Sequence, residues 1–297
     1  MIYFEVFLMR NPDLTVYKSN KVIEAGYKLS LNEQRLVLMA IAKVNSNKPL
    51  SSLDRFEVTA KEFAEKFEIS EDKAYQTLKE VSEQLFERYV VIDNPDPETP
   101  TLKYTKTRWI SSIDYLPELG KVSMYFAQKM LPYLSELKGT FTFYQIEHIG
   151  GMSSTYAIRL YELLMQWKST GKREIEIEWL KQQFELDESY DRMFDLKKRV
   201  IEPAVDDINN HSDYKVSWSQ RKTGRRVTHL IFQFSEKNPT SPKKPKKAVS
   251  SAVITKTPEI KVDNIEYFAD MRKKYGNNSQ IIIPEDIVAI LKAQGRW

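Results

Sequence analysis

The sequence predicts an α+β protein in which one structural unit occurs twice. A strand-and-helix pattern is repeated along the chain, and hydrophobic residues recur with both helical and strand periodicity. The length of 297 residues is enough for two domains, each with its own core. Hydrophobic residues make up 41% of the chain and charged residues 29%, which is typical of a folded globular protein.

Each copy of the unit opens with a helix rich in apolar residues, at Arg35–Lys43 and again at Arg159–Lys168. Before the first of these, Ser30 and Glu33 have the spacing of a capping box, in which the hydroxyl and the carboxylate satisfy free backbone N–H groups. The pattern therefore predicts a helix that starts at Ser30.

A short strand and a short helix come next in each copy. The strands alternate apolar and polar residues at Phe56–Thr59 and Ile175–Glu178, and Thr59 with Glu62 forms a second capping box. Both short helices end in Phe-Glu followed by Ile or Leu, at positions 117 residues apart (Phe67 and Phe184).

A longer amphipathic helix follows, and six of its positions match between the copies at a spacing of 119. The two-residue difference falls in the polar turn between helices, where insertions are tolerated. Two strands around a polar turn close each copy. We expect them at Tyr89–Asp93 and Leu102–Ile113 in the first copy, and at Tyr214–Trp218 and Val227–Phe234 in the second.

The order helix, strand, helix, helix, strand, turn, strand is that of a winged-helix domain, a helix-turn-helix variant whose third helix can enter a DNA major groove. We therefore predict two tandem winged-helix domains. Residues 120–143 should add a strand, a helix over Ala127–Leu137 closed by Gly139, and another strand to the first domain. The expected divisions are an N-terminal extension (1–13), the first domain (14–148), the second domain (149–234) and a C-terminal tail (235–297).

The two ends of the chain have a different composition. Residues 235–251 are rich in Pro, Lys and Ser, which predicts a flexible basic linker ahead of a short helical tail. The apolar Met1–Leu8 precedes a more ordinary start, so we expect an upstream extension with Met9 as the native start. No stretch approaches the roughly 20 apolar residues of a membrane span, and we expect a cytoplasmic protein with no membrane partner.

The formal net charge of +4 conceals an uneven distribution. Residues 1–150 carry 19 basic and 21 acidic residues, residues 151–234 carry 14 and 13, and residues 235–297 carry 12 and 7. Within the second domain, Lys215–His229 has five basic residues and no acid. An acid-free wing beside a helix that is basic at its N-terminal end indicates a DNA-binding surface.

The candidate DNA-binding residues of the second domain lie on its long helix and its wing. They are Arg192, Lys197, Lys198 and Arg199 on the helix, and Arg221, Lys222, Arg225 and Arg226 on the wing. The buried side of the helix should carry Met193, Leu196, Val200, Ala204 and Ile208. Pro203 predicts a kink near Arg199, because proline cannot donate the backbone hydrogen bond to that residue.

The first domain carries a weaker signal for DNA binding. Its candidates are Lys73, Gln76 and Thr77 on the long helix, and Lys106 and Arg108 on the following strand. Because Glu80, Glu83 and Glu87 lie close by on the same helix, a structural role and a DNA-binding role both remain open.

Several classes of enzyme and metal protein have no support in the sequence. With no cysteine and three scattered histidines, we expect no metal site, no cofactor and no catalytic residue. A rolling-circle nicking enzyme, which joins DNA to a tyrosine, needs paired histidines, and no His-x-His occurs. No Gly-x-x-x-x-Gly-Lys-Ser/Thr loop is present to hold the triphosphate of a helicase.

Four segments in this order resemble one known family. They are SLNEQRLVLMAIAKV, TYAIRLYELLMQW, FDLKKRVIEPAVDDIN and GRRVTHLIFQF. The chain resembles the iteron-binding initiator (Rep) proteins of theta-replicating bacterial plasmids over about residues 14–234. The resemblance does not extend to Met1–Leu8 or to the tail.

The resemblance implies a set of partners and two oligomeric forms. Members bind origin direct repeats (iterons) as monomers, help to melt the origin, and recruit the host replication initiator and the replicative helicase. Dimers joined through the first domain bind an inverted operator repeat and repress their own gene. The resemblance also implies that the second domain reads the bases and the first domain provides dimerisation and auxiliary contacts. The remaining alternatives are a winged-helix transcriptional regulator without initiator activity and, from another class, the nicking enzyme.

Overall fold

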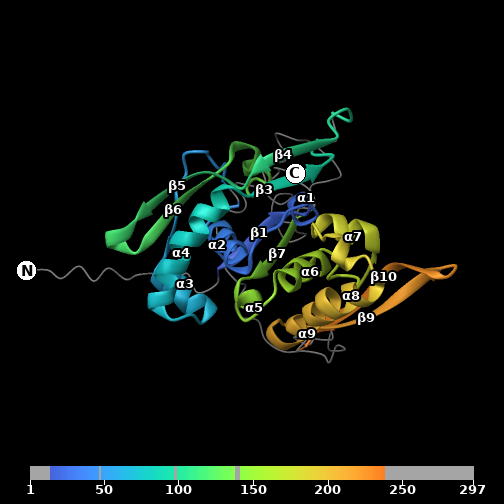
Figure 1. Cartoon of the computed structure of the whole chain (residues 1–297). Helices are drawn as coiled ribbons and strands as arrows, with labels where there is room; N and C mark the ends of the chain where they lie inside the picture. Colours follow the sequence, from blue (N-terminus) through green and yellow to red (C-terminus); the bar gives the residue numbers. More distant parts are fainter. Residues whose placement is uncertain (1–13, 47, 97–98, 138–140, 238–297) are drawn as a thin grey trace, which may run out of the picture. The chain divides into compact units, whose positions relative to one another are not determined.

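A computed structural model describes residues 14–46, 48–96, 99–137 and 141–237 of the chain (Figure 1). All of them belong to the first of the chain's two compact units, residues 1–240. The predictions about the native start, Gly139 and the basic linker and tail lie outside the described residues. No helix in the described part of the chain is long and apolar enough to cross a membrane.

The first winged-helix domain combines three helices with a three-stranded antiparallel sheet of order β2-β6-β5. The helices are α2 (Leu31–Ala42), α3 (Ala60–Phe67) and α4 (Glu71–Phe86). The strands are β2 (Phe56–Thr59), β5 (Ile110–Leu116) and β6 (Lys121–Phe126), with η1 (Pro117–Leu119) between the last two. Both predicted capping boxes are present, at Ser30 with Glu33 and at Thr59 with Glu62.

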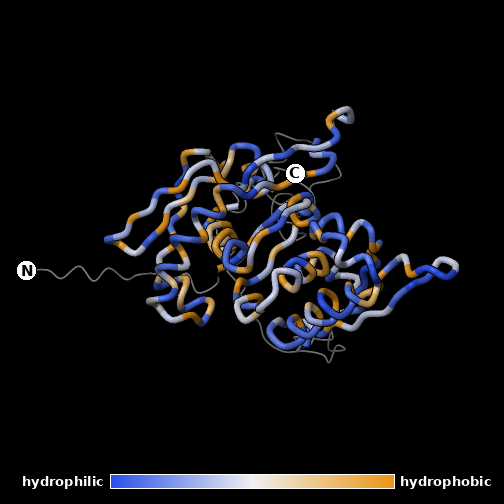
Figure 2. Tube along the Cα trace, viewed as in Figure 1, coloured by the Kyte–Doolittle hydropathy of each residue, from blue (hydrophilic) through white to orange (hydrophobic). Residues whose placement is uncertain are grey.

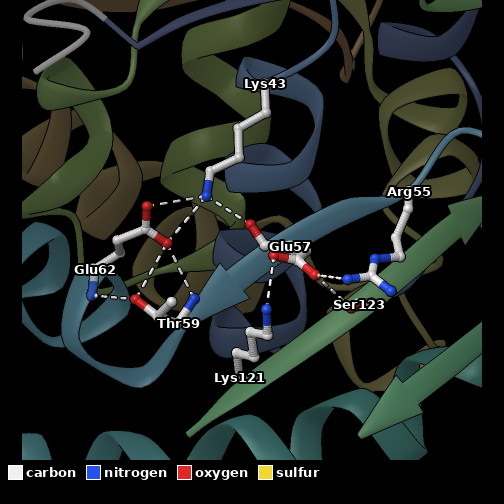
Figure 3. A network of polar contacts seen from close by, with 7 residues as sticks. All are labelled: Lys43, Arg55, Glu57, Thr59, Glu62, Lys121 and Ser123. Carbon is white, nitrogen blue, oxygen red and sulfur yellow. Dashed lines mark hydrogen bonds and ion pairs between the residues drawn. The ribbon is translucent and has the colours of Figure 1, made fainter. Parts of the chain in front are cut away.

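A polar network fixes the start of α3 to the neighbouring elements (Figure 3). Lys43, which caps the C-terminus of α2, donates from Nζ to both carboxylate oxygens of Glu62 at 3.0 Å and to the carbonyl of Glu57. The Glu57 carboxylate in turn accepts from Lys121 on β6 at 3.0 Å and pairs with Arg55. The capping box thus also ties helix α2 to the sheet.

The second domain repeats this arrangement with a sheet of order β8-β10-β9, so that the third strand again lies between the first and the second. Its elements are α6 (Thr155–Met165), β8 (Lys172–Glu176), α7 (Ile177–Gln183), η3 (Glu188–Tyr190), α8 (Met193–Leu196), a π-turn η4 (Lys197–Ile201), α9 (Glu202–His211), β9 (Tyr214–Thr223) and β10 (Arg226–Glu236). Glu68 and Glu185 follow the matched short helices, and both adopt left-handed φ values of 53° and 47°. The prediction of two tandem winged-helix domains is confirmed.

The predicted wing of the first domain is wrong. The strands expected to flank it, β3 (Tyr89–Asp93) and β4 (Tyr104–Arg108), pair with each other in a separate two-stranded sheet. The wing in the winged-helix topology is the β5–β6 hairpin, which turns at Pro117–Gly120. β3 and β4 are therefore an insertion between the third helix and the winged sheet.

Two further predictions about the first domain need correction. The strand expected over Leu102–Ile113 is divided at Trp109, whose side chain is buried and meets the Tyr27 ring edge-on at 4.9 Å. The helix expected over Ala127–Leu137 is only a 3₁₀ segment, η2 (Gln128–Tyr133). Pro132 lies inside that segment and cannot donate a helical hydrogen bond, which explains the shorter element.

The remaining elements join the two domains. β1 (Thr15–Ser19) pairs antiparallel with β7 (Phe141–Gln145), a pairing that local patterns did not reveal. The short helices α1 (Asn20–Ile23) and α5 (Glu147–Gly150) lead towards the first helix of each domain. α6 packs against α9 of its own domain and also against β7 and α1.

Two equivalent arginines make reciprocal contacts between the two copies. Arg159 on α6 donates to the carbonyls of Ala25 and Tyr27, both at 2.7 Å. Arg35, placed 124 residues earlier on α2, donates to the carbonyls of Gly150 and Met152 at 3.3 and 3.1 Å. Each arginine thus satisfies the backbone that leads into the first helix of the other copy.

The same two guanidinium groups also pack on matched phenylalanines. Arg35 lies 4.8 Å from the centroid of the Phe67 ring and Arg159 lies 5.1 Å from that of Phe184. These are the two phenylalanines that the repeat aligns at a spacing of 117. The duplication is therefore visible in tertiary contacts as well as in element order.

A buried ion pair reinforces this joint. Lys18 on β1 donates to both carboxylate oxygens of Glu162 on α6, at 2.9 and 3.0 Å, and both side chains are 1% exposed. The Tyr144 hydroxyl donates to the same carboxylate at 2.6 Å. Burial lowers the pKa of Lys18, but the adjacent Glu162 carboxylate outweighs it and the net pKa is raised.

Glu162→Gln should lower the free energy of unfolding by about 3–5 kcal/mol, because Lys18 would remain buried without a counter-ion. Urea denaturation followed by tryptophan fluorescence measures the change. Glu188→Gln is the matched control, since Glu188 is exposed and its side chain forms no ion pair with a described residue. An unchanged urea midpoint for Glu162→Gln would show that the pair does not stabilise the fold.

The free energy of unfolding should fall as the pH rises above about 10. Burial, followed by the neighbouring Glu162 carboxylate, raises the pKa of Tyr144 well above its usual value, so the unfolded chain releases this proton first. Burial and Asp213 raise the pKa of Tyr161 in the same direction. Denaturation midpoints measured from pH 8 to 11 check this, and Tyr144→Phe should give a shallower decline.

Candidate nucleic-acid interface

The third helix of the second domain is continuous from Met193 to His211 but changes its winding in the middle. Its second segment, Lys197–Ile201, is a π-turn, in which the N–H of Glu202 donates to the carbonyl of Lys197. Pro203 follows at once and has no N–H for the carbonyl of Arg199. At the position of the predicted kink, the helix changes from α-helical to π-helical winding and continues as α9 without a break.

The predicted buried side of this helix is confirmed. Leu196, Val200, Ala204 and Ile208 are at most 1% exposed, and Met193 packs at the edge of the core. The opposite side carries the basic residues. Arg192, which is the N-cap residue, Lys198 and Arg199 are exposed, and Lys197 is half-buried. The sequence therefore placed the apolar and basic sides of the helix correctly.

Phe194 is the exception on this helix, with 71% of its surface exposed. The repeat aligns it with Tyr75, which is half-buried in the first domain and packs against its core. In the second domain the same position faces solvent beside Lys197 and Lys198. An exposed phenylalanine among cations suits apolar contact with a thymine methyl group. No local sequence pattern indicated that Phe194 is exposed, and only the structure shows it.

The wing is longer than the sequence indicated, with strands over Tyr214–Thr223 and Arg226–Glu236. β9 and β10 extend as a hairpin beyond the helices of their domain, and most of its far end is hydrophilic (Figures 1 and 2). The strands are joined by a two-residue turn, Gly224-Arg225, in which Gly224 has a φ of +62° that favours glycine. Lys197 lies 5.5 Å from the centroid of the Trp218 ring on β9, so the helix and the wing are neighbours.

The wing itself carries no acid, as predicted, but acids of neighbouring elements pair with two of its arginines. Glu174 on β8 pairs with Arg221, and Glu178 on α7 pairs with Arg226 at 3.1 Å. The hydrogen bond from the Arg221 guanidinium lowers the pKa of Glu174. Both acids are distant in sequence from their partners, since Glu174 precedes Arg221 by 47 residues and Glu178 precedes Arg226 by 48. Part of the positive charge of the wing is therefore neutralised within the domain.

Three of the eight candidate cations of this domain are both exposed and without an ion pair to a described residue. They are Lys198, Lys222 and Arg225. Arg192 and Arg199 both approach the carboxylate of Asp195. A surface of long, exposed cations from a helix and an adjacent hairpin fits the phosphate groups and the groove of duplex DNA.

The candidates of the first domain do not form one surface of this kind. Lys73 and Thr77 lie on α4, and Gln76 there donates to Glu80 at 2.6 Å. Lys106 and Arg108 lie on the inserted hairpin, where each cation stacks on an aromatic ring. Lys106 lies 3.7 Å from the Tyr89 centroid and Arg108 lies 4.9 Å from that of Phe86. Arg108 also pairs with Glu87 at 3.1 Å, so its charge is not free.

Two family models match the chain. One is described as "Initiator Replication protein, WH1" and matches residues 15–165, and the other as "Initiator Rep protein, WH2" and matches residues 176–234. The first match extends through α6, which the structure packs against both domains.

Known proteins of similar sequence and fold include two from Escherichia coli. A "Replication initiation protein" is 29% identical over 228 residues, covering 74% of this chain and 69% of its own length. "PI protein" is 24% identical over 260 residues, covering 77% and 85%. Among solved structures, the Pi initiator protein in complex with iteron DNA superimposes with a TM-score of 0.65 at 23% identity, covering 76% of this chain and 98% of that one.

Replacing Arg225 by alanine should weaken binding to every duplex alike and reduce the slope of log affinity against log salt concentration by about 1. Arg226→Ala is the matched control at the next position. It should change the slope less, because Glu178 already shares the charge of Arg226. Fluorescence anisotropy between 50 and 200 mM salt measures both slopes. Equal slopes for the two variants would contradict the proposed difference.

Proposed function

The chain belongs to the family of initiator replication proteins, and on that basis we propose that it starts plasmid replication by binding duplex DNA at the origin in a sequence-specific manner. The observation that carries the proposal is the basic third helix of the second domain beside a basic wing. Neither element needs a cofactor or a metal for this role. The protein is proposed to act as a binding protein in the bacterial cytoplasm and to catalyse no reaction.

We infer that the DNA target is a set of origin direct repeats. The relative of similar fold, the Pi initiator, is solved with iteron DNA, and the two chains are alike over nearly all of that protein. The second domain is proposed to read the bases with the exposed residues of its helix. The contacting cations are Arg192, Lys197, Lys198 and Arg199, with Arg221, Lys222, Arg225 and Arg226 placed along the phosphates.

The first domain is proposed to make auxiliary DNA contacts and to dimerise. Its auxiliary contacts would come from Lys73, Gln76 and Thr77 on α4, with Lys106 and Arg108 on the inserted hairpin. As a dimer the protein would bind an inverted operator repeat and repress its own gene, and as a monomer it would occupy the iterons. The protein would also help to melt the origin and would recruit the host initiator and the helicase. Family membership supports these two steps.

The protein should bind tightly to a duplex that carries direct repeats from beside its own gene, and a plasmid that carries those repeats should depend on it for replication. Electrophoretic mobility shifts and plasmid maintenance measure the two properties. Binding confined to an inverted repeat, without maintenance of the plasmid, would identify a transcriptional regulator. Magnesium-dependent nicking of supercoiled origin DNA would instead identify a nicking enzyme.

A further inference from the structure

One buried acid lies within the basic part of the third helix. Asp195 is 3% exposed, although it belongs to the first turn of a helix whose neighbouring side chains are exposed cations. Its Oδ2 accepts from Arg192 Nε at 2.8 Å, and its Oδ1 lies 3.6 Å from Arg199 Nε. One carboxylate therefore faces two arginines, one through each oxygen.

The two arginines approach Asp195 with the same part of the guanidinium group. Both use Nε, Arg192 in a hydrogen bond and Arg199 in an ion pair, and neither forms a hydrogen bond from its Nη groups to any described residue. Their side chains remain 83% and 60% exposed. A guanidinium held at Nε still presents its two terminal N–H groups outward as a fork. That fork is the part of arginine that donates to guanine O6 and N7 in the major groove.

We propose that Asp195 is a positioning residue that holds Arg192 and Arg199 so that each reads a guanine. The inference rests on the proposed function, because it assumes that this helix enters a major groove. The third helix would thus recognise guanines, and Asp195 would be needed for this recognition without contacting DNA. Holding each arginine in advance also lowers the side-chain entropy lost on binding.

Two simpler roles for Asp195 make different predictions. As a charge only, Asp195 would repel phosphates, and its removal would strengthen binding to all DNA alike. As an acid in the first turn, it would stabilise the helix, and its removal would lower stability without changing base preference. The positioning role instead requires that loss of Asp195 weakens specific binding while non-specific binding is unchanged or stronger.

The experiment is a selection from a randomised duplex pool with the full-length chain, followed by affinity measurements on the selected duplex and on a scrambled one. Asp195→Ala should flatten the preference at two guanine positions and reduce the ratio of specific to scrambled affinity by about tenfold or more. Asp195→Asn keeps one oxygen acceptor and should flatten at least one position. Asp206→Asn is the control, because Asp206 is exposed on the same helix and forms no ion pair with a described residue.

Arg192→Lys and Arg199→Lys keep the charge but lose the fork, so each should flatten one guanine position. They also decide the outcome if the Asp195 variants fail to fold. Retention of the full guanine preference by both lysine variants, or tighter binding of Asp195→Ala to both duplexes with an unchanged ratio, would overturn the inference. If the wild-type chain selects no sequence at all, the proposed function itself fails.

Discussion

Two arginines at equivalent positions hold this protein together. Arg35 and Arg159 each leave their own copy of the repeated unit and satisfy two backbone carbonyls in front of the first helix of the other copy. A hydrogen bond to a charged donor contributes about 1.5–3 kcal/mol, and these carbonyls would otherwise be buried without partners. The buried pair of Lys18 and Glu162 adds a second constraint on the same joint. The third helix of each domain packs against the first helix of that domain, and these arginine contacts hold the two first helices together.

The second domain offers a basic surface that its nearly neutral net charge does not suggest. The core takes the apolar side of the third helix, and the wing lies next to its basic side through Lys197 and Trp218. Acids of the same domain form ion pairs with some of these cations and leave others unpaired. Arg221 and Arg226 are paired with Glu174 and Glu178, whereas Lys198, Lys222 and Arg225 form no ion pair with a described residue and can meet phosphates.

Much of this fold could be predicted from the sequence, because winged-helix order depends on local signals such as capping boxes and hydrophobic periodicity. The strands of each predicted hairpin do pair, but the sheet to which a hairpin belongs could not be predicted, since alternation does not specify which more distant strands pair. The first-domain wing was misplaced for that reason, and the burial of Trp109 between two strands hid the boundary of the insertion. The cationic residues of the site were found by composition, but the acid that faces Arg221 is distant in sequence.

We propose that DNA binds the basic side of the second domain. Photo-cross-linking to a duplex with 5-iodouracil in place of thymine, followed by mass spectrometry of the attached peptides, tests it most directly. We expect cross-links in the segment from Arg192 to Arg199, including the exposed Phe194, and in the wing around Arg225. Cross-links confined to the first domain, with none in these two segments, would show that DNA binds a different surface.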